Sequence, residues 1–508
     1  MVGDMTWLRS CIVAALMLLA FAGNVTGDVV EQGPKDSKPS GLLAGVARAD
    51  ISPPSAIAQL NWGSQTHVES TGIDPAGMFA TAIVLSDGRQ KFAIVEADYI
   101  SPQGLADAIP RAAERAGIPA AHIRINTTHT HSGPSFTPGK GPVGTDPAKY
   151  SPLVDAYRSM AREKIVSVIV EAGANLRPVH AYGAKGIGSV NMNRRVRGKG
   201  DIPPAVGTNP EGFVDRELVV IRLDDAQGKP YAVLVNFQCH GTVLTYENKT
   251  ISPDWIGMAR KMVERAMPGV TALYLQGAAG NQGPIEGGTG DIEVAHRLGT
   301  ILGLEAAALA MRTDTVLREK NIEGYIESTA FGAIERWRVA GPRDATLKFA
   351  AKTLELPARQ YSPQDIDRMA TLTAEARKNL DQALRSGDTW KKYQAEARLR
   401  RWSDLLERYK RPQTAKAVLV DVQALRIGEM AIVAMPGEPF AEIGAAIKRA
   451  SPFPITMFCG YSNGRGGGYM PVEAEYAQGG YEVDMTPYGI GAAEKLIRET
   501  AELVKSLR

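Results

Sequence analysis

Short apolar runs alternate with longer amphipathic runs from residue 41 onward, and this alternation separates strands from helices. Runs rich in β-branched residues flank tight turns, as at 82–85 and 92–95, which enclose the turn Ser86-Asp87-Gly88 and are typical of paired strands. Apolar positions three and four residues apart predict helices elsewhere. The predicted strands are 82–85, 92–95, 123–126, 218–221, 232–235, 273–275, 417–424, 430–435 and 454–459. The predicted helices are 103–117, 153–172, 254–266, 291–312, one ending at 450, and 491–508.

Hairpin-like strand pairs occur beside strands that are followed by helices, and this mixture decides the fold class. It indicates an α/β (mixed α+β) fold, with mixed β-sheets flanked by helices. No internal repeat is visible in the sequence. We therefore interpret residues 41–508 as a single large domain.

The segment 362–411 differs from its surroundings because it is strongly charged and carries large apolar residues only at helical spacing. Gly387 divides it, so we expect a helical-hairpin insertion. A solvated two-helix arm over the core is the simplest interpretation, and a lid or an oligomer contact is the alternative. The residues that set the spacing are Leu380, Leu384, Tyr393, Trp402, Leu405 and Tyr409.

The N-terminus has the pattern of a targeting segment. Arg9 precedes a short apolar run at 11–22, and the small residues Gly23 and Gly27 follow. This pattern predicts a signal peptide at 1–27, a polar linker at 28–40 and a secreted or periplasmic protein. An uncleaved anchor is the alternative. We expect no later segment to be apolar enough to cross a bilayer.

Composition narrows the class of protein further. The 508 residues are 44% hydrophobic and carry a formal net charge of +3, without a long basic run. This balance suits a soluble globular chain and gives no indication of a nucleic-acid partner. Beyond the predicted signal peptide only Cys239 and Cys459 remain, too few for a disulfide scaffold. They could form one bridge, but we expect two buried thiols.

Candidate metal ligands follow three of the predicted strands. His129 and His131 follow strand 123–126, and in an extended segment residues two apart point to the same face. His240 follows strand 232–235, and Glu438 follows strand 430–435. Two histidines and a glutamate form the ligand set of many catalytic zinc sites. Surface histidines, a structural histidine and a carboxylate at a helix N-terminus are the plainer interpretations, and no spacing rule links these residues.

Two glycine-rich runs also follow predicted strands. The first, at 276–284, contains Gly280, Asn281 and Gly283, and its backbone N–H groups could cradle an anion or an oxyanion. It is not a P-loop, because the Gly-Lys-Ser/Thr ending is absent. The second, at 460–468, permits close approach of the backbone to a ligand, or is a plain flexible loop.

Taken together and in order, six short runs between about residue 42 and the C-terminus resemble the neutral/alkaline non-lysosomal ceramidases. They begin with the opening run at 44–51, and the most specific is Thr-His-Thr-His-Ser-Gly-Pro at 128–134. The others are Asn-Met-Asn-Arg at 191–194, His-Gly-Thr at 240–242, Pro-Gly-Glu at 436–438, and the run from Gly460 to Tyr481.

The resemblance implies a Zn²⁺ ion held by His129, His240, Glu438 and Tyr469. It also implies catalytic roles near the scissile amide: His131 in proton transfer, and Arg194 or Tyr481 in stabilising charge on the carbonyl oxygen. The expected activity is hydrolysis of an N-acyl substrate such as ceramide to fatty acid and amine, by a water that zinc activates. A lipid substrate would bring the protein into transient contact with a membrane surface.

Three departures from the family pattern bear on the substrate. Gly283 stands where the family has a catalytic serine, we expect no counterpart of the family's C-terminal immunoglobulin-like domain, and we interpret 362–411 as an insertion. A zinc amidase or esterase with a non-ceramide substrate is therefore one alternative, and a non-catalytic binding protein on the same fold is another. Retention of His131 and Arg194 beside the expected ligands favours an enzyme.

Overall fold

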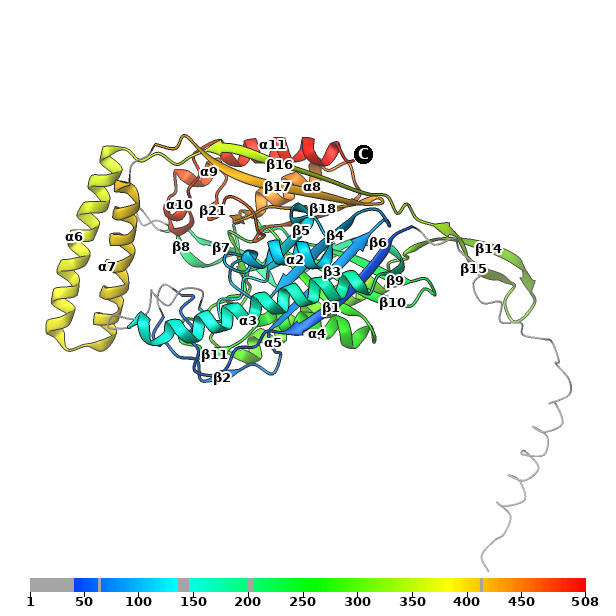
Figure 1. Cartoon of the computed structure of the whole chain (residues 1–508), viewed down its shortest axis with the longest axis horizontal. Helices are drawn as coiled ribbons and strands as arrows, with labels where there is room; N and C mark the ends of the chain where they lie inside the picture. The colour runs from blue at the N-terminus through cyan, green and yellow to red at the C-terminus, as the bar shows by residue number, and fades with distance from the viewer. Residues whose placement is uncertain (1–40, 63–64, 136–145, 199–203, 412–413) are drawn as a thin grey trace, which may run out of the picture. The chain divides into compact units, whose positions relative to one another are not determined.

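Residues 41–508 are described by a computed structural model, except 63–64, 136–145, 199–203 and 412–413 (Figure 1). The predicted signal peptide and linker lie outside the described residues. The largest sheet has eight strands in the order β12-β10-β9-β6-β1-β3-β4-β5. In chain order these strands are β1 Leu43–Asp50, β3 Phe79–Ser86, β4 Lys91–Ala97, β5 Ile123–Thr127, β6 Arg177–Ile187, β9 Glu217–Asp225, β10 Pro230–Phe237 and β12 Thr271–Gln276.

This sheet consists of two groups of four strands with the same pairing order. In β1-β3-β4-β5 the first two contacts are antiparallel and the last is parallel, and β6-β9-β10-β12 repeats the pattern. Within the sheet the groups are joined where Leu43 and Ala44 of β1 pair with the start of β6. The fold thus repeats a topology that has no counterpart in a sequence repeat.

A second, four-stranded sheet packs against one face of the large sheet. Its order is β16-β17-β18-β20, with β16 Leu347–Pro357, β17 Ala417–Ile427, β18 Met430–Ala434 and β20 Ile455–Cys459. Alternating apolar residues of both sheets form one buried cluster between them, for example Ile83 and Leu234 with Leu425 and Met457. Side chains alternate across a strand, so the residues in between face the helices instead.

Helices cover the outer faces of both sheets (Figure 1). α2 (Ile109–Ala116) and α3 (Pro147–Ala174) pack on the β1-β3-β4-β5 group, and α4 (Asp254–Ala266) and α5 (Ile292–Met311) pack on the other group. α8 (Ala441–Ala450) and α11 (Ala492–Lys505) cover the four-stranded sheet. The mixed α/β architecture expected from the sequence is confirmed as four layers: helices, sheet, sheet, helices.

Among the described residues, α5 is long and apolar enough by composition to span a membrane, which corrects the expectation that no such segment follows residue 40. Its packing marks it as a core helix. A Cβ at Gly299 would lie 2.0 Å from the Trp255 carbonyl oxygen, and one at Gly303 would lie 2.5 Å from that of Ala259. The two glycines therefore let α5 lie directly against α4 inside the protein.

The helical hairpin predicted at 362–411 is confirmed as α6 (Pro363–Ser386) and α7 (Thr389–Lys410). Ser362 and Asp365 form a capping box at the start of α6, and Gly387 ends that helix in the left-handed region, with φ 69°. The hairpin, called the arm below, extends a β-hairpin, because Pro357 of β16 pairs with Ala417 of β17 just outside it.

Several elements carried no clear sequence signal. β14 (Val316–Ile326) and β15 (Gly332–Pro342) form a hairpin whose residues are mostly exposed, so its sequence has no regular apolar face. β6 contains two glycines, and the remaining strands are very short. The remaining elements are β2 Gly72–Ile73, β7 Asn191–Val196, β8 Ala205–Asn209, β11 Thr250–Ile251, β13 Gln282–Pro284, β19 Glu438–Pro439, β21 Tyr469–Met470, η1 Ala106–Ala108, η2 Ala120–His122, α9 Glu473–Tyr476 and α10 Tyr481–Met485.

The two cysteines are free and buried, as expected. Burial raises the pKa of the Cys459 thiol to about 12 and raises that of Cys239 well above its ordinary value. Both thiols therefore act as small apolar groups in the core.

Candidate metal centre

Loops that follow strands of both sheets meet at one place. The end of β5 pairs with the loop after β20 through an Asn126–Ser462 bridge, and the loop after β5 pairs with the loop after β10 through Thr130 and Gly241. The Gln276 N–H at the end of β12 donates to the Asn126 side chain at 2.8 Å. Segments that are far apart in the chain are thereby fixed around a common centre.

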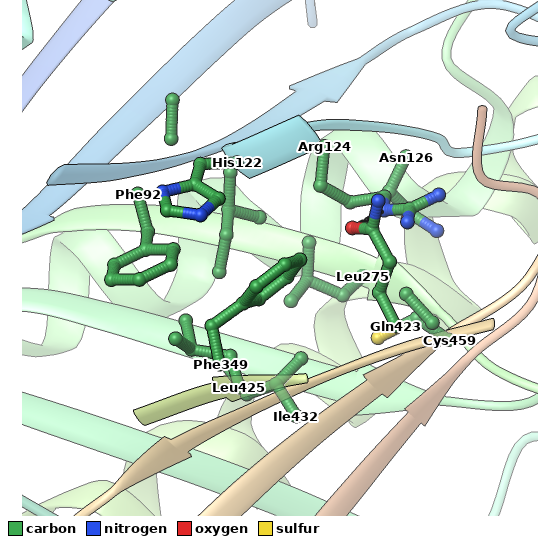
Figure 2. Close-up of a pocket in the computed structure, with 13 residues that line it drawn as sticks. Phe92, His122, Arg124, Asn126, Leu275, Phe349, Gln423, Leu425, Ile432 and Cys459 are labelled. Atoms are coloured by element: carbon green, nitrogen blue, oxygen red, sulfur yellow. Dashed lines mark hydrogen bonds between the residues drawn. The ribbon is translucent and has the colours of Figure 1, made fainter. Parts of the chain in front are cut away.

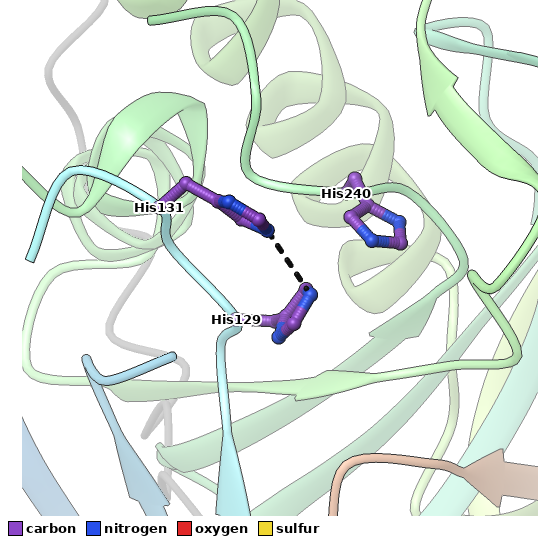
Figure 3. A group of neighbouring side chains, drawn as sticks. All are labelled: His129, His131 and His240. Carbon is purple, nitrogen blue, oxygen red and sulfur yellow. Dashed lines mark hydrogen bonds between the residues drawn. The ribbon is translucent and has the colours of Figure 1, made fainter. Parts of the chain in front are cut away.

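Three histidines lie at this centre (Figure 3). The Nε2 atoms of His129 and His131 are 3.3 Å apart, and the ligand atoms of these two and His240 all lie within 4.8 Å of one another. The sequence argument placed His129 and His131 on one face of an extended strand. β5 instead ends at Thr127, and His129 has a left-handed backbone with φ 62°. A local turn therefore brings the two rings together.

Backbone carbonyl groups orient two of the rings. His129 Nδ1 lies 2.6 Å from the Ile100 carbonyl oxygen, and His240 Nδ1 lies 2.7 Å from that of Ala279. Nδ1 is then the protonated nitrogen in both rings, which leaves the Nε2 lone pairs directed at the centre. The His240 Nε2 is buried and forms no hydrogen bond. An unsatisfied lone pair of this kind is what a metal ligand requires.

Glu438 approaches the same centre from the second sheet. Its Oε2 lies 3.4 Å from His129 Nε2 and 3.3 Å from His240 Nε2. With ligands at about 2.1 Å, neighbouring donors of a tetrahedral zinc ion are separated by about 3.4 Å. The distances from Glu438 to the two histidines therefore match the spacing of a tetrahedral site, and His131 lies at the same spacing from His129.

The protonation states suit a cation. Burial lowers the pKa of His240 to about 3 and that of His131 well below its ordinary value, so both rings are neutral at pH 7. Burial alone would raise the pKa of Glu438, but its interactions with the neighbouring His129 and His240 hold it well below its usual range. Neutral imidazoles beside a carboxylate are the donor set that divalent zinc takes.

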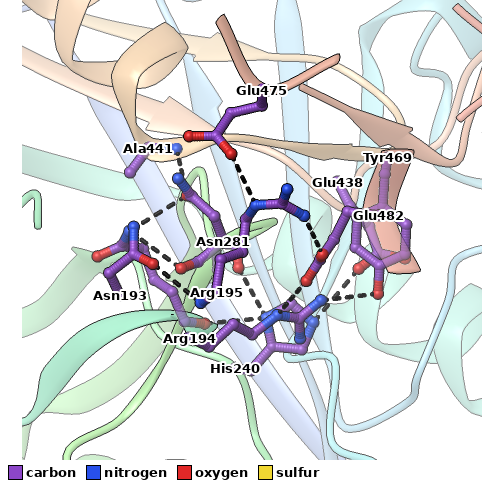
Figure 4. Close-up of polar contacts among 12 residues, drawn as sticks. Asn193, Arg194, Arg195, His240, Asn281, Glu438, Ala441, Tyr469, Glu475 and Glu482 are labelled. Atoms are coloured by element: carbon purple, nitrogen blue, oxygen red, sulfur yellow. Dashed lines mark hydrogen bonds and ion pairs between the residues drawn. The ribbon is translucent and has the colours of Figure 1, made fainter. Parts of the chain in front are cut away.

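Arg194, on β7, adjoins this group (Figure 4). Its NH2 donates to the Tyr469 hydroxyl at 3.1 Å, and its Nε donates to Glu482 at 3.0 Å. Burial disfavours a charged Arg194, but Tyr469 and Glu482 outweigh this effect and raise its pKa. A fixed, buried cation beside the histidines suits the stabilisation of a developing oxyanion.

Tyr469 and Tyr481 form part of the wall of the pocket at the candidate metal centre. Tyr469 pairs with Glu438 between the short strands β19 and β21, and its ring meets that of Tyr481 edge-on at 5.4 Å. Burial and the Glu438 charge raise the pKa of both phenols. Both rings line an open pocket of about 950 Å³ that also exposes His129, His131 and Glu438.

A second open groove lies between the arm and α10, and its volume is about 2020 Å³. Trp402 and Leu405 of the arm line it together with Tyr481 and Met485 of α10. Tyr481 lines both this groove and the pocket that exposes His129, His131 and Glu438. The groove therefore runs from the arm to the edge of that pocket.

The glycine loop at 276–284 has a different role from the predicted anion cradle. The Gly280 N–H donates to the Pro439 carbonyl at 2.9 Å, and the Asn281 side chain accepts from the Ala441 N–H and donates to Glu442. These groups hold the segment that carries Glu438, so they are not free to bind an oxyanion. Gly283 lies in β13, beside the Arg194 side chain.

Sequence reasoning missed the residues that position the site. Glu482 is almost fully buried and also accepts from Arg195 at 2.6 Å, while Arg195 donates to Glu475 at 2.9 Å. The Tyr461 hydroxyl lies 3.5 Å from Glu438 Oε2. Glu475 and Glu482 stand on short helices with ordinary polar surroundings in the sequence, so only the fold identifies them.

The chain is similar in sequence to proteins of known family. Residues 42–284 match the family model described as neutral/alkaline non-lysosomal ceramidase, N-terminal. The neutral ceramidase of Pseudomonas aeruginosa is 25% identical over 397 residues, which cover 72% of this chain and 57% of that protein. Neutral ceramidase B of Dictyostelium discoideum is 29% identical over 158 residues, which cover 29% of this chain and 20% of that protein.

The fold is also found among solved structures. The crystal structure of neutral ceramidase from Pseudomonas aeruginosa matches 93% of this chain and 75% of its own, with a TM-score of 0.62 and 18% identity. The chain covers less than two thirds of the length of each curated relative described above.

Proposed function

We propose that this chain, which belongs to the neutral/alkaline non-lysosomal ceramidase family, is a zinc-dependent hydrolase of N-acyl amides, with a ceramide-type lipid as the first candidate substrate. The proposal covers the metal, the reaction and the substrate. The relatives are named as ceramidases, and we propose the same activity for this chain.

The observation that carries the proposal is the spacing of His129, His240 and Glu438. Glu438 Oε2 lies 3.4 Å from His129 Nε2 and 3.3 Å from His240 Nε2. The His240 Nε2 has no hydrogen bond. We propose Tyr469 as the fourth ligand, since it pairs with Glu438 across β19 and β21. A zinc ion in this position would activate water and polarise the scissile carbonyl.

The chain's own residues then have separate tasks. His131, 3.3 Å from His129, is placed to accept a proton from the attacking water and to return it to the departing amine. Arg194, held by Glu482 and hydrogen-bonded to Tyr469, would stabilise negative charge that develops at this edge of the pocket, and Tyr481, which lines the pocket, can donate to the carbonyl oxygen. Because Arg194 is buried and held in place before substrate binds, it is worth more than a mobile donor.

Gly283 favours a second candidate. The serine that the family resemblance implies is absent, so a different amide or ester, or binding without turnover, would also fit this site. The retained Arg194 and His131 support turnover. The groove beside the arm gives room for a long acyl chain next to the pocket.

The test combines metal content with turnover of a fluorescent N-acyl sphingosine. Wild-type protein is expected to hold about one zinc per chain and to release fatty acid in a chelator-sensitive way. His240→Ala is expected to lose both. His180→Ala is a matched control, because His180 is also a buried histidine but lies on β6, outside the site.

Stoichiometric zinc in His240→Ala would show that the ligand assignment is wrong. Zinc without turnover in the wild type would leave the metal site in place, and would require a screen of other amides and esters. Loss of zinc in His180→Ala would mean that the effect is a general one on folding.

A further inference from the structure

The space between the two sheets is nearly full. Phe92 of β4 and Phe349 of β16 lie beside it (Figure 2), and its free volume is about 30 Å³. About one or two water molecules fit into such a volume, so this cavity has no room for an organic ligand. Among the described residues, the three most exposed aromatic side chains all belong to the hairpin of β14 and β15.

This hairpin projects from the body of the protein, at the end opposite the arm (Figure 1). Among the described residues, those from 319 to 340 form hydrogen bonds and ion pairs only with one another. A two-stranded hairpin that stands alone in water is marginally stable at best. Something is therefore expected to cover it.

The apolar side chains gather on one side of the hairpin. Trp337 lies opposite Lys320, and residues two apart on a strand share a side. A bulge after Ile322 brings Tyr325 to this same side, where its ring stacks on that of Phe331 at 5.2 Å. The bulge breaks the period of two, which is why the sequence shows no regular apolar face. The apolar residues of this side, called the aromatic patch below, are Ile322, Tyr325, Phe331, Trp337 and Val339.

The other side of the hairpin is mainly charged and is already paired. Glu323 forms ion pairs with Arg336 at 3.3 Å and with Arg338. The three rings of the aromatic patch, in contrast, are 61–66% exposed. Exposed apolar patches of several hundred Å² mark interaction surfaces. The hairpin therefore has one side that is suited to a partner.

Charge divides the hairpin along its length. The half next to the body, residues 316–321 and 336–342, has four basic residues and one acidic residue, a net charge of +3. The outer half, residues 322–335, has three glutamates and no basic residue, a net charge of −3. Two such hairpins attract each other when they lie antiparallel, because each acidic half then covers a basic half.

The same charge pattern argues against a lipid surface as the partner. The residues at the tip are Glu327, Ser328 and Thr329, which are polar and would meet the lipid headgroups first. Anionic headgroups would repel the acidic outer half. A second copy of the chain, in contrast, presents the opposite charge at the required place.

From these observations we propose that the aromatic patch binds the same patch of a second copy of this chain. The two hairpins lie antiparallel and face to face, about a two-fold axis near Ile322. At their present exposure the patch residues would bury on the order of 500 Å² per copy. A standard stable interface buries about 800 Å² per copy, and the flanking charged residues supply the rest. This surface does not depend on the proposed hydrolysis.

The first test is sedimentation velocity of the full chain over a range of concentrations. We expect a reversible dimer for the wild type. Trp337→Ser should raise the dimer dissociation constant at least tenfold, because central aromatic residues dominate the energy of interfaces. Trp390→Ser is the matched control, since Trp390 is also an exposed tryptophan but lies on α7 of the arm. It should leave the dissociation constant unchanged.

A second test addresses the antiparallel arrangement. Arg318 precedes Ile322 by four residues and Glu327 follows it by five, so the proposed axis places each Arg318 over the partner's Glu327. Arg318→Glu and Glu327→Lys should each weaken the dimer, since each places like charges together. An equimolar mixture of the two variants should dimerise at least tenfold more tightly than either alone, because both contacts again join opposite charges.

Four results would overturn the proposal. The first is a wild type that is monomeric at every concentration, and the second is a dimer that Trp337→Ser does not weaken. The third is a mixture of the charge variants that associates no better than each variant alone, which does not depend on Trp337→Ser. The fourth is binding of the monomer to phosphatidylglycerol vesicles that Trp337→Ser abolishes, which would assign the aromatic patch to a lipid surface.

Discussion

At the scale of single residues, two glycines of one loop differ sharply in what surrounds them. A Cβ at Gly283 would contact the Arg194 Cβ at 3.4 Å, an ordinary distance, whereas one at Gly280 would lie 2.4 Å from the Glu438 carbonyl oxygen. The first position can therefore accept a side chain, and the second cannot without moving a proposed ligand.

Restoring the serine at the first position is a direct test of the site. Gly283→Ser is expected to fold with a stability change of about 1 kcal/mol or less, because the backbone needs no left-handed angle. It should keep its zinc and raise turnover of N-acyl sphingosine at least tenfold, since the hydroxyl would lie beside Arg194. Metal analysis and kcat/KM provide the measurements.

Gly280→Ser is the matched control, and it should lose zinc through displacement of Glu438. Unchanged turnover in Gly283→Ser would indicate that the serine hydroxyl is not what limits this chain, and would point to a different substrate.

The sequence pointed to the candidate ligands but not to the residues that position them. His129, His131, His240 and Glu438 could be selected because each follows an apolar strand and precedes a break. Their convergence could not be predicted from spacing, since it depends on how β5, β10 and β18 end together. Glu482 left no signal, because its role is created by contacts with Arg194 and Arg195.

At the scale of elements, the arm is attached in a way that permits its removal. Pro357 pairs with Ala417, and the Ala358 N–H donates to the Lys416 carbonyl at 3.0 Å, so the strands on either side are already a hairpin. The arm contacts α10 through an Arg401–Asp484 ion pair at 2.8 Å and a bond from Arg408 to the Met485 carbonyl.

Replacing residues 360–414 with an Asn-Gly turn should therefore leave the fold and the zinc content intact. We expect KM for a long-chain N-acyl substrate to rise at least fivefold, because the groove between the arm and α10 is lost, while a short soluble N-acyl amide is unaffected. Steady-state kinetics on both substrates test this. Arg401→Ala, which removes one ion pair and one of the groove's lining side chains but keeps both helices of the arm, should change KM much less. Equal effects on the two substrates would contradict a role in binding the acyl chain.

The start of α4 gives a pH-dependent prediction. Burial raises the pKa of Asp254 to about 6, although backbone N–H groups of Leu244, Trp255 and Val243 oppose the rise. A carboxyl with a raised pKa in the folded state contributes stability below its unfolded pKa of about 3.8, and this contribution is lost as pH rises through about 6.

Asp254→Asn removes this titration and keeps a residue that tolerates the φ of 55°. Its stability relative to wild type should therefore increase between pH 4 and pH 7, by about 3 kcal/mol at most. Urea midpoints of both proteins at several pH values provide the measurement. Parallel pH curves would show that the wild-type carboxyl does not titrate in this range.

Long periodic elements were predictable, and short or exposed ones were not. α3, α5, α6 and α7 follow from apolar spacing and, between α6 and α7, from the break at Gly387. The β14–β15 hairpin could not be found in this way, because mostly exposed strands carry no alternating apolar face. β19 and β21 have two residues each and exist only because tertiary contacts align them.

At the scale of the whole molecule, the proposed ligands come from both sheets. His129 and His240 follow β5 and β10 of the large sheet, while Glu438 follows β18 of the small one. A metal ion at this place would tie the two layers together in addition to their shared apolar core.

Chelation should therefore lower the thermal stability of the wild type, and added zinc should restore it, because a ligand of the folded state stabilises in proportion to its binding. Scanning calorimetry with and without chelator is the measurement. His240→Ala, already without metal, should not respond further. A wild-type Tm that is insensitive to chelator, with zinc shown to have been removed, would mean that the ion does not link the layers.

The four-layer arrangement was only partly predictable. The mixture of hairpins and strand–helix units indicated mixed sheets with helices, but not that two sheets would pack face to face. The repeated order of β1-β3-β4-β5 and β6-β9-β10-β12 was also hidden, since pairing depends on backbone direction rather than on residue identity.

The distribution of the ligands over distant strands also has a consequence for the order of folding. Joining His129, His240 and Glu438 closes long stretches of chain, and the entropy cost of such loops has to be offset by packing that already exists. Zinc could then find its full set of ligands only after the layers had docked. Metal uptake would be a late step of maturation. It would stabilise the folded protein and would not direct its folding.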